Sequence, residues 1–211
     1  MTAMERPDVF KGVHKGLRKA LFDLAVQAGA TDASRADEGA ALAAKAKEVF
    51  HFVEHHAWNE DRFLEPMMAA KGMPEADRMR IDHERLEAEV SALAEAAGRL
   101  GQTPQWFHGF YLSLNRFIAE YLVHLHEEET AILPALHARF TDAELADFSR
   151  QSVAATAPAD QEMMLTYMFP AMNAGELRDF FAGLQGKAPA EMVAHLRGIA
   201  ERTTFFPTLD T

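Results

Sequence analysis

Apolar residues recur every three or four positions along most of this 211-residue chain, a spacing that predicts helices. Ala, Leu, Glu, Met and Lys are abundant, and the alternating β-branched runs typical of strands are absent from the sequence. Glycines and prolines divide the first two thirds into four helical segments of about 20 to 32 residues. The expected helices span residues 8–28, 34–65, 74–101 and 103–133. We therefore expect an all-α protein, with an antiparallel up-down four-helix bundle in residues 1–140.

Particular residues indicate where these helices begin and end. Gly29 is placed to end the first helix as its C-terminal glycine. Pro66 should weaken or kink the end of the second, and Gly72 should close that segment. Thr103 and Pro104 together are typical of an N-cap followed by a first-turn proline, so we expect the fourth helix to begin there.

Residues 141–211 form a separate segment, which we expect to be a helical C-terminal extension packed on the bundle. Thr141 and Glu144 have the spacing of a capping box that opens a short helix. Breaks between helices are expected at Pro158, Asn173, Gly186 and Pro189. They predict three more short helices, up to about Thr203. The extension is rich in Met and Phe, which indicates packing on the bundle or a homodimer contact. A groove for an apolar ligand is the alternative, but no polar anchor supports it.

The charge and composition exclude several classes of function. Lys and Arg total 21 against 32 Asp and Glu, a net charge of −11 that disfavours nucleic-acid partners. The sequence has no cysteine, which excludes disulfides, zinc fingers and cysteine-bound iron–sulfur clusters. No stretch approaches the roughly 18 apolar residues of a membrane helix. The N-terminus lacks the form of a secretory signal, so we expect no membrane partner and a cytoplasmic location.

An internal repeat carries the candidate chemistry. The second helix contains His56, Glu60 and Pro66, and the fourth contains His124 and Glu128, followed by a proline at the same spacing. Both segments therefore read His-x3-Glu-x5-Pro, and two copies are not expected by chance from this composition. His and Glu four residues apart lie on the same face of a helix. Both pairs fall in apolar stripes that face the bundle core.

The other two helices each place one histidine, His14 or His83, on their apolar face. Each helix thus presents one inward imidazole, and two helices add an inward carboxylate. Because a charged Glu is almost never buried without a partner, a metal centre would explain this arrangement. The six candidate metal ligands are His14, His56, Glu60, His83, His124 and Glu128.

The ligand set indicates the kind of metal. Four imidazoles and two carboxylates exceed the four ligands of a structural zinc site and suit two metals bridged by the carboxylates. Mixed nitrogen and oxygen ligands favour iron, with manganese as an alternative. About four coordination positions would remain open for water or a small molecule. The remaining histidines point away from these stripes, and Glu127 and Glu129 are expected to form a solvated acidic face. Arg18, one turn after His14, either balances a nearby carboxylate or simply packs.

This pattern of H, HxxxE, H and HxxxE resembles the hemerythrin and HHE cation-binding family over roughly residues 8 to 140. The resemblance implies a four-helix bundle around a non-heme di-iron centre. Oxygen-carrying members have His-x3-His on the third helix and His-x4-Asp on the fourth, where this chain has Glu87 after His83 and Glu128 after His124. The pattern is more similar to iron-centre repair proteins and hemerythrin-like sensors.

Three further residues lie near the candidate ligands. Glu87 shares a face with His83 and is a candidate additional ligand. Glu120 lies one turn before His124. It is a candidate either to contact a metal ligand or to line a path for iron or protons. Tyr121 lies close enough to the same stripe to hydrogen-bond a small molecule at the metals.

The expected function is therefore that of a non-heme di-iron protein that binds or reacts with dioxygen, peroxide or nitric oxide. Redox or iron sensing, detoxification and iron-centre repair all fit. The sequence does not separate an oxidoreductase that consumes peroxide or nitric oxide from a binding protein. One alternative is a helical structural or interaction module without a catalytic metal centre, which would leave two buried carboxylates unexplained. Heme binding is another, disfavoured by the Glu residues beside the histidines.

Overall fold

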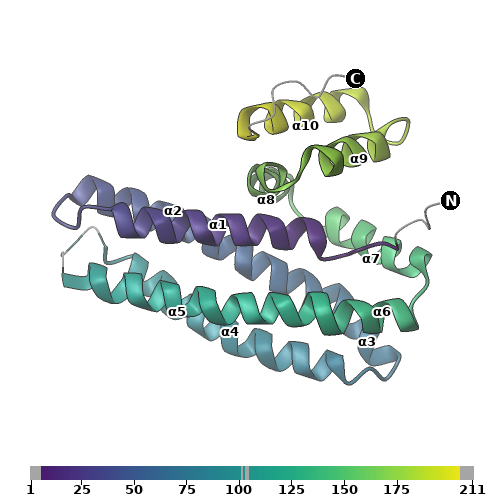
Figure 1. Cartoon of the computed structure of the whole chain (residues 1–211), viewed down its shortest axis with the longest axis horizontal. Coiled ribbons are helices and arrows are strands. Elements are labelled where there is room, and N and C mark those ends of the chain that lie inside the picture. Colours follow the sequence, from purple (N-terminus) through teal and green to yellow (C-terminus); the bar gives the residue numbers. More distant parts are fainter. Residues whose placement is uncertain (1–5, 101, 103–104, 205–211) are drawn as a thin grey trace.

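The computed structural model describes residues 6–100, 102 and 105–204, and its regular elements are all helical. Four long helices run antiparallel to their neighbours and form the bundle (Figure 1). They are α1 (Lys11–Ala30), α2 (Ala36–Asn59), α4 (Glu75–Ala97) and α5 (Gln105–Glu127). α1 packs against α2 and α5, and α4 packs against the same two helices, so the four helices close into a ring. The predicted four-helix bundle is confirmed.

The second and fourth helical segments continue beyond α2 and α5, each through one π-helical turn. The π segments are η1 (Glu60–Leu64) and η2 (Glu128–Ile132), followed by α3 (Glu65–Ala70) and α6 (Leu133–Arg139). The local break expected near Pro66 is therefore present, and the chain turns at Gly72, which has a φ of 65°. The fourth segment extends beyond the expected end at residue 133.

Two expected helix ends were wrong. α1 continues through Gly29 to Ala30, and Gly29 lies close to the Tyr111 ring instead of adopting a left-handed C-terminal conformation. α4 ends at Ala97, with Gly98 as its C-cap, four residues before the expected end. The predicted N-cap at Thr103 and Pro104 lies outside the described residues.

The extension consists of short helices whose starts agree with the sequence signals. They are α7 (Asp142–Ala155), α8 (Pro158–Ala171), α9 (Ala174–Leu184) and α10 (Ala190–Thr203). The capping box of Thr141 and Glu144 is present, and Asn173 forms a second one with Glu176. Figure 1 shows α8 lying across α1, with α9 and α10 on its outer side. The apolar residues of the extension thus pack on the bundle and on one another.

Two apolar clusters fill the bundle, one on each side of a polar layer. The larger follows the long helices from Leu17 to Ala28 and from Leu42 to Val53, with matching residues of α4 and α5. The smaller lies at the other end, where Phe10, α3 and α6 meet α7. His14, His56 and His83 lie between these two clusters in sequence on their helices, and His124 lies beside Leu125, the last residue of the larger cluster on α5. The polar layer is therefore sealed by hydrocarbon at both ends.

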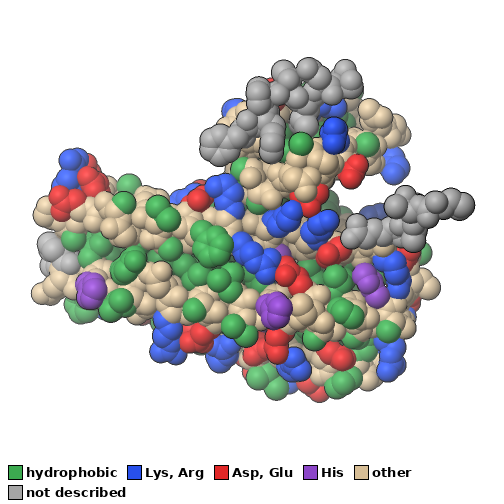
Figure 2. All heavy atoms as spheres, viewed as in Figure 1, with side chains coloured by type: hydrophobic (Ala, Val, Ile, Leu, Met, Phe, Trp, Pro, Cys, Tyr) green, Lys and Arg blue, Asp and Glu red, His purple; other side chains and the backbone are tan. Residues whose placement is uncertain are grey.

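Large apolar side chains remain exposed on all four long helices of the bundle. They are Phe22 and Val26 on α1, Trp58 on α2, Ile81 on α4, and Trp106, Leu112 and Val123 on α5. Figure 2 shows hydrophobic side chains spread over one face of the molecule. No helix in the described part of the chain is long and apolar enough to span a membrane.

Gly16 permits the close approach of α8 to α1. A Cβ atom at this position would lie 2.8 Å from the Cγ of Met168 and 3.2 Å from its Cα and backbone nitrogen. We predict that Gly16→Ala lowers the free energy of unfolding by about 1–3 kcal/mol, because the backbone of α8 must shift. Gly109→Ala on α5, where no atom lies within 4 Å, should instead raise it by about 0.5–1 kcal/mol. Urea unfolding of both variants tests this, and equal effects would contradict the close packing of α8.

Candidate metal centre

The polar layer of the bundle consists of buried histidine and glutamate side chains from all four helical segments. His14 lies on α1, His83 on α4, and the two His-x3-Glu pairs end α2 and α5 and begin η1 and η2. Each of these side chains is at most 4% exposed. The six predicted ligands are His14, His56, Glu60, His83, His124 and Glu128, and the structure brings all of them together.

The six side chains divide into two groups of four that share both carboxylates. One group contains His14 and His56 with the two glutamates, and the other contains His83 and His124 with the same glutamates. Within each group, one ligand atom from each residue lies within 4.8 Å of all the others. The imidazole rings of each histidine pair have centroids 5.0 Å apart. The geometry therefore offers two adjacent groups that could each hold a metal ion, and both carboxylates belong to each group.

Glu128 lies between the two histidine pairs and presents one oxygen to each. Its Oε2 is 3.2 Å from Nε2 of His14 and 3.9 Å from Nε2 of His56. Its Oε1 is 3.2 Å from Nε2 of His124 and 3.7 Å from Nε2 of His83. A carboxylate with one oxygen directed at each histidine pair has the orientation of a ligand that could bridge two metals.

Glu60 repeats the arrangement from the other side. Its Oε1 lies 3.4 Å from Nε2 of His56, and its Oε2 lies 3.3 Å from Nε2 of His83.

Several buried polar atoms of the cluster have no hydrogen-bond partner in the described part of the chain. They are Nε2 of His14, His56 and His83, Oε2 of Glu60, and both oxygens of Glu128. Buried polar atoms are normally satisfied, so this concentration of lone pairs fits a bound cation.

Both bridging candidates open a π-helical turn, and the repeat explains why. In each π segment the backbone N–H five residues on donates to the carbonyl of the glutamate: Glu65 to Glu60, and Leu133 to Glu128. The next residue is a proline in both copies, and a proline has no N–H with which to continue the α-helical pattern. The repeated proline therefore accompanies a local change of helix geometry at the glutamates.

Comparison with known families agrees with this geometry. Residues 7–136 match the hemerythrin HHE cation binding domain, a match that covers more than half of the chain and all six side chains. This chain belongs to the hemerythrin HHE cation-binding family. Searches among curated proteins and among solved structures gave no match. The extension from α7 onward lies outside the hemerythrin match.

His14 of the hemerythrin domain is oriented by a carboxylate and an arginine. Its Nδ1–H donates to Oε1 of Glu129 at 2.9 Å, which leaves Nε2 directed at the shared carboxylates. Arg18 donates to both oxygens of Glu129, at 2.6 and 2.9 Å. The expectation that Glu129 forms part of a solvated face is therefore wrong. Of the two alternatives for Arg18, the structure shows the pairing with a carboxylate. A carboxylate in this position fixes the tautomer of a ligating imidazole.

His83 has an equivalent partner that the sequence analysis did not identify. Its Nδ1–H donates to Oδ1 of Asp61 at 2.6 Å. Asp61 directly follows Glu60, as Glu129 directly follows Glu128, so both copies of the repeat carry a second acidic residue. That pair of consecutive acids was the available sequence signal.

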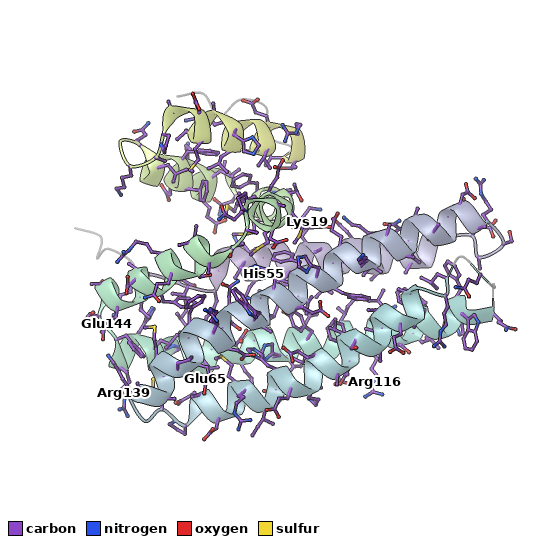
Figure 3. The ribbon with its side chains drawn as sticks, turned by 180° about the vertical axis from the view of Figure 1, so that it is seen from behind. Lys19, His55, Glu65, Arg116, Arg139 and Glu144 are labelled. Carbon is purple, nitrogen blue, oxygen red and sulfur yellow. The ribbon has the colours of Figure 1, made fainter. Side chains whose placement is uncertain are left out.

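The three additional candidates have different positions. Tyr121 is 2% exposed, its ring packs beside His124, and its hydroxyl has no hydrogen-bond partner in the described residues. Glu120 lies at the surface, where its carboxylate pairs with Arg85 and with Arg116, a residue labelled in Figure 3. Glu87 is exposed and belongs to neither group of four.

Three of the histidines outside the cluster have partners other than the candidate ligands. His51 lies 2.9 Å from Asp160, and His55, labelled on α2 in Figure 3, hydrogen-bonds Asn59. His137 donates to the carbonyl of Pro7. Within the residues that the structure describes, none of these histidines joins a group of potential metal ligands.

The cluster favours proton binding when no metal is present. Burial acts to lower the pKa of His14, but Glu128 and Glu129 override it and raise this pKa to about 9. The same competition, with Asp61, Glu128 and Glu60 as partners, raises the pKa of His83 to about 12. Burial acts to raise the pKa of Glu128, yet His124 and the other histidines hold it well below its usual value. A metal must therefore displace these protons in order to bind.

The oriented imidazoles give the first prediction for this site. We expect Glu129→Gln to weaken metal binding by about 10–100-fold at the His14 and His56 position, because the imidazole loses its acidic partner. Asp61→Asn should have the same effect at the other position. Glu127→Gln, which removes an exposed carboxylate paired with Arg78, is the control. Titration of ferrous iron under anaerobic conditions measures both affinities, and an equal effect of all three variants would contradict the assignment.

The raised pKa of His14 predicts how the metal-free protein responds to pH. Its charged form stabilises the fold fully below pH 6.5, and this contribution is lost as the pH rises to about 9. At about 1.4 kcal/mol per pKa unit, the loss is roughly 3 kcal/mol. Urea unfolding of chelator-treated protein across this range should show the decrease. The metal-loaded protein should lack it, because a ligating imidazole is already neutral; a flat profile for the metal-free protein would contradict the prediction.

Proposed function

We propose that this hemerythrin-family protein is a non-heme di-iron protein that binds or reacts with dioxygen, peroxide or nitric oxide. The observation that supports it most strongly is the division of six buried side chains into two groups that share Glu60 and Glu128. A single closed four-ligand site would not need two carboxylates with one oxygen facing each histidine pair.

The composition of each group favours iron. Each supplies two imidazole nitrogens and two carboxylate oxygens, which leaves about two positions open on a six-coordinate metal. A structural zinc site would use all its positions for protein ligands, and manganese would also accept this set. An iron pair supplies the ability to bind a small ligand at an open position and to exchange electrons with it.

The chain's own residues hold and protect such a pair. Glu129 and Asp61 accept hydrogen bonds from the Nδ1 atoms of His14 and His83, so the Nε2 lone pair of each ring is available to bind a metal. The apolar clusters on both sides of the layer exclude bulk water. Tyr121 remains protonated, because burial and the nearby Glu128 raise its pKa well above 10, and its hydroxyl is available as a donor.

Redox or iron sensing, detoxification and iron-centre repair are the roles that we propose for this chemistry. An oxidoreductase would consume many equivalents of peroxide or nitric oxide per iron pair. A sensor would give a stoichiometric spectral change, and an iron donor would release its metal to an acceptor. Turnover assays with both small molecules separate these roles.

Metal content tests the proposed function. Protein from iron-replete cells should contain about two irons per chain, since the six ligands form two groups. Glu128→Ala should lose most of both irons because Glu128 faces both histidine pairs, whereas His14→Ala should lose mainly one. Glu127→Gln, its exposed neighbour, should retain both. These values are measured by mass spectrometry together with the visible spectrum.

Two results would contradict the proposal. Wild-type protein that remains metal-free and colourless after anaerobic addition of ferrous iron would favour a structural or interaction module. A Soret band in the purified protein would favour heme binding instead.

A further inference from the structure

The last three helices of the extension form a unit with a core of its own. Their buried apolar side chains make up a third cluster, separate from the two clusters of the bundle: Phe169, Leu177, Phe181, Ile199 and Ala200. α7 instead contributes Leu145 and Phe148 to the smaller bundle cluster. Thr156 and Ala157, both extended, connect α7 to α8. The α8–α10 unit can therefore turn about this link without losing its own core.

A methionine side chain on α8 docks this unit on the bundle. Met168 is half-buried and packs against α1. A Cβ atom at Gly16 would lie 2.8 Å from the Cγ of Met168, and one at Gly12 would lie 3.3 Å from its Cε. Because Sδ is bonded to both Cγ and Cε, the sulfur lies over the groove between the two glycines. Met172, one turn further along α8, places its Cε 3.5 Å from the same position at Gly12. Thioether side chains therefore make the contact of α8 with α1 at these glycines.

The two helices approach too closely at these glycines to accept an additional atom between them. The Cα and backbone nitrogen of Met168 would each lie 3.2 Å from a Cβ at Gly16, so the contact involves the backbone of α8 as well as its side chain. Oxidation of a thioether adds an oxygen and converts an apolar side chain into a polar one. An oxygen held in this contact would lose its hydration and crowd its neighbours, whereas undocking returns it to water.

Two further kinds of contact hold the unit on the bundle. Lys15 of α1 pairs with Glu176 of α9 at 2.7 Å, but both side chains are partly exposed, and such ion pairs contribute little net stability. Tyr167 stacks on Phe52 of α2, with ring centroids 5.7 Å apart. Docking on α1 itself therefore depends largely on the methionine contacts at the two glycines.

We propose that hydrogen peroxide oxidises Met168 and that the resulting sulfoxide undocks the α8–α10 unit from α1. The sulfur attacks one peroxide oxygen, the O–O bond breaks, and an S–O bond forms while the other oxygen leaves as water. The sulfur loses two electrons, and the peroxide gains them. Peroxide reaches the sulfur because Met168 is half-buried and not enclosed. The step requires no metal, so this inference goes beyond the proposed di-iron function and does not depend on it.

Single-molecule energy transfer tests the undocking. Because the sequence has no cysteine, Ala44→Cys on α2 and Glu201→Cys on α10, both at exposed positions, allow specific attachment of two dyes to the full chain. Untreated protein should show one narrow transfer efficiency. Hydrogen peroxide should add a broad second population and raise the ratio of undocked to docked protein about ten- to hundredfold. Peptide mass spectrometry measures oxygen addition at each methionine, in iron-loaded and in chelator-treated protein.

Three variants assign the effect to one sulfur. Met168→Leu has a similar volume and no sulfur, so it should remain docked before and after peroxide. Met168→Gln places a polar group in the groove and should show the broad population without peroxide. Met192→Leu removes a methionine of α10 that is 51% exposed, and should respond to peroxide as the wild type does. Thermal unfolding shows whether each variant is folded.

Three outcomes would overturn this inference. The first is a Met168 that stays unoxidised at peroxide concentrations that oxidise Met192 completely. The second is a Met168 sulfoxide that forms without changing the transfer efficiency. The third is an undocked population that appears equally in Met168→Leu, because another methionine would then cause it. Wild-type protein without iron would contradict the proposed function alone, since chelator-treated protein should undock in the same way.

Discussion

Two carboxylates buried in the centre of a helical bundle are the constraint on which the rest of this structure depends. Glu60 and Glu128 are 2% and 0% exposed, and removing ionised groups from water costs several kcal/mol each unless cations compensate. Four imidazoles surround them, one from each helical segment, so all four segments must meet at one level. Apolar clusters on both sides then hold the helices in register.

The repeat specifies geometry as well as ligands. Its histidine and glutamate supply donor atoms, the acid after the glutamate orients a histidine on a neighbouring helix, and its proline follows a π turn. The two copies nevertheless differ at the position after the histidine, where one has Ala57 and the other Leu125. A nearly symmetric ligand set thus lies among unlike neighbouring side chains.

Much of the fold and the six clustered residues were predictable, because helical periodicity and a repeated motif depend on local sequence. Glu129 and Asp61 were not recognised as partners of the histidines, because consecutive residues of a regular α-helix point in different directions. In the π turns the rotation per residue is smaller, and the partners His14 and His83 lie on other helices. Glu120 shared a predicted stripe with His124, but cross-helix pairing with Arg85 holds it at the surface. Such pairings between helices are not encoded in the periodicity of either helix.

The most direct test of the central claim is a crystal structure of the iron-loaded protein with anomalous diffraction at the iron edge. Our interpretation predicts two iron peaks, one beside His14 and His56 and the other beside His83 and His124. Both should lie within bonding distance of Glu60 and Glu128. A single peak, or iron bound away from these carboxylates, would contradict it.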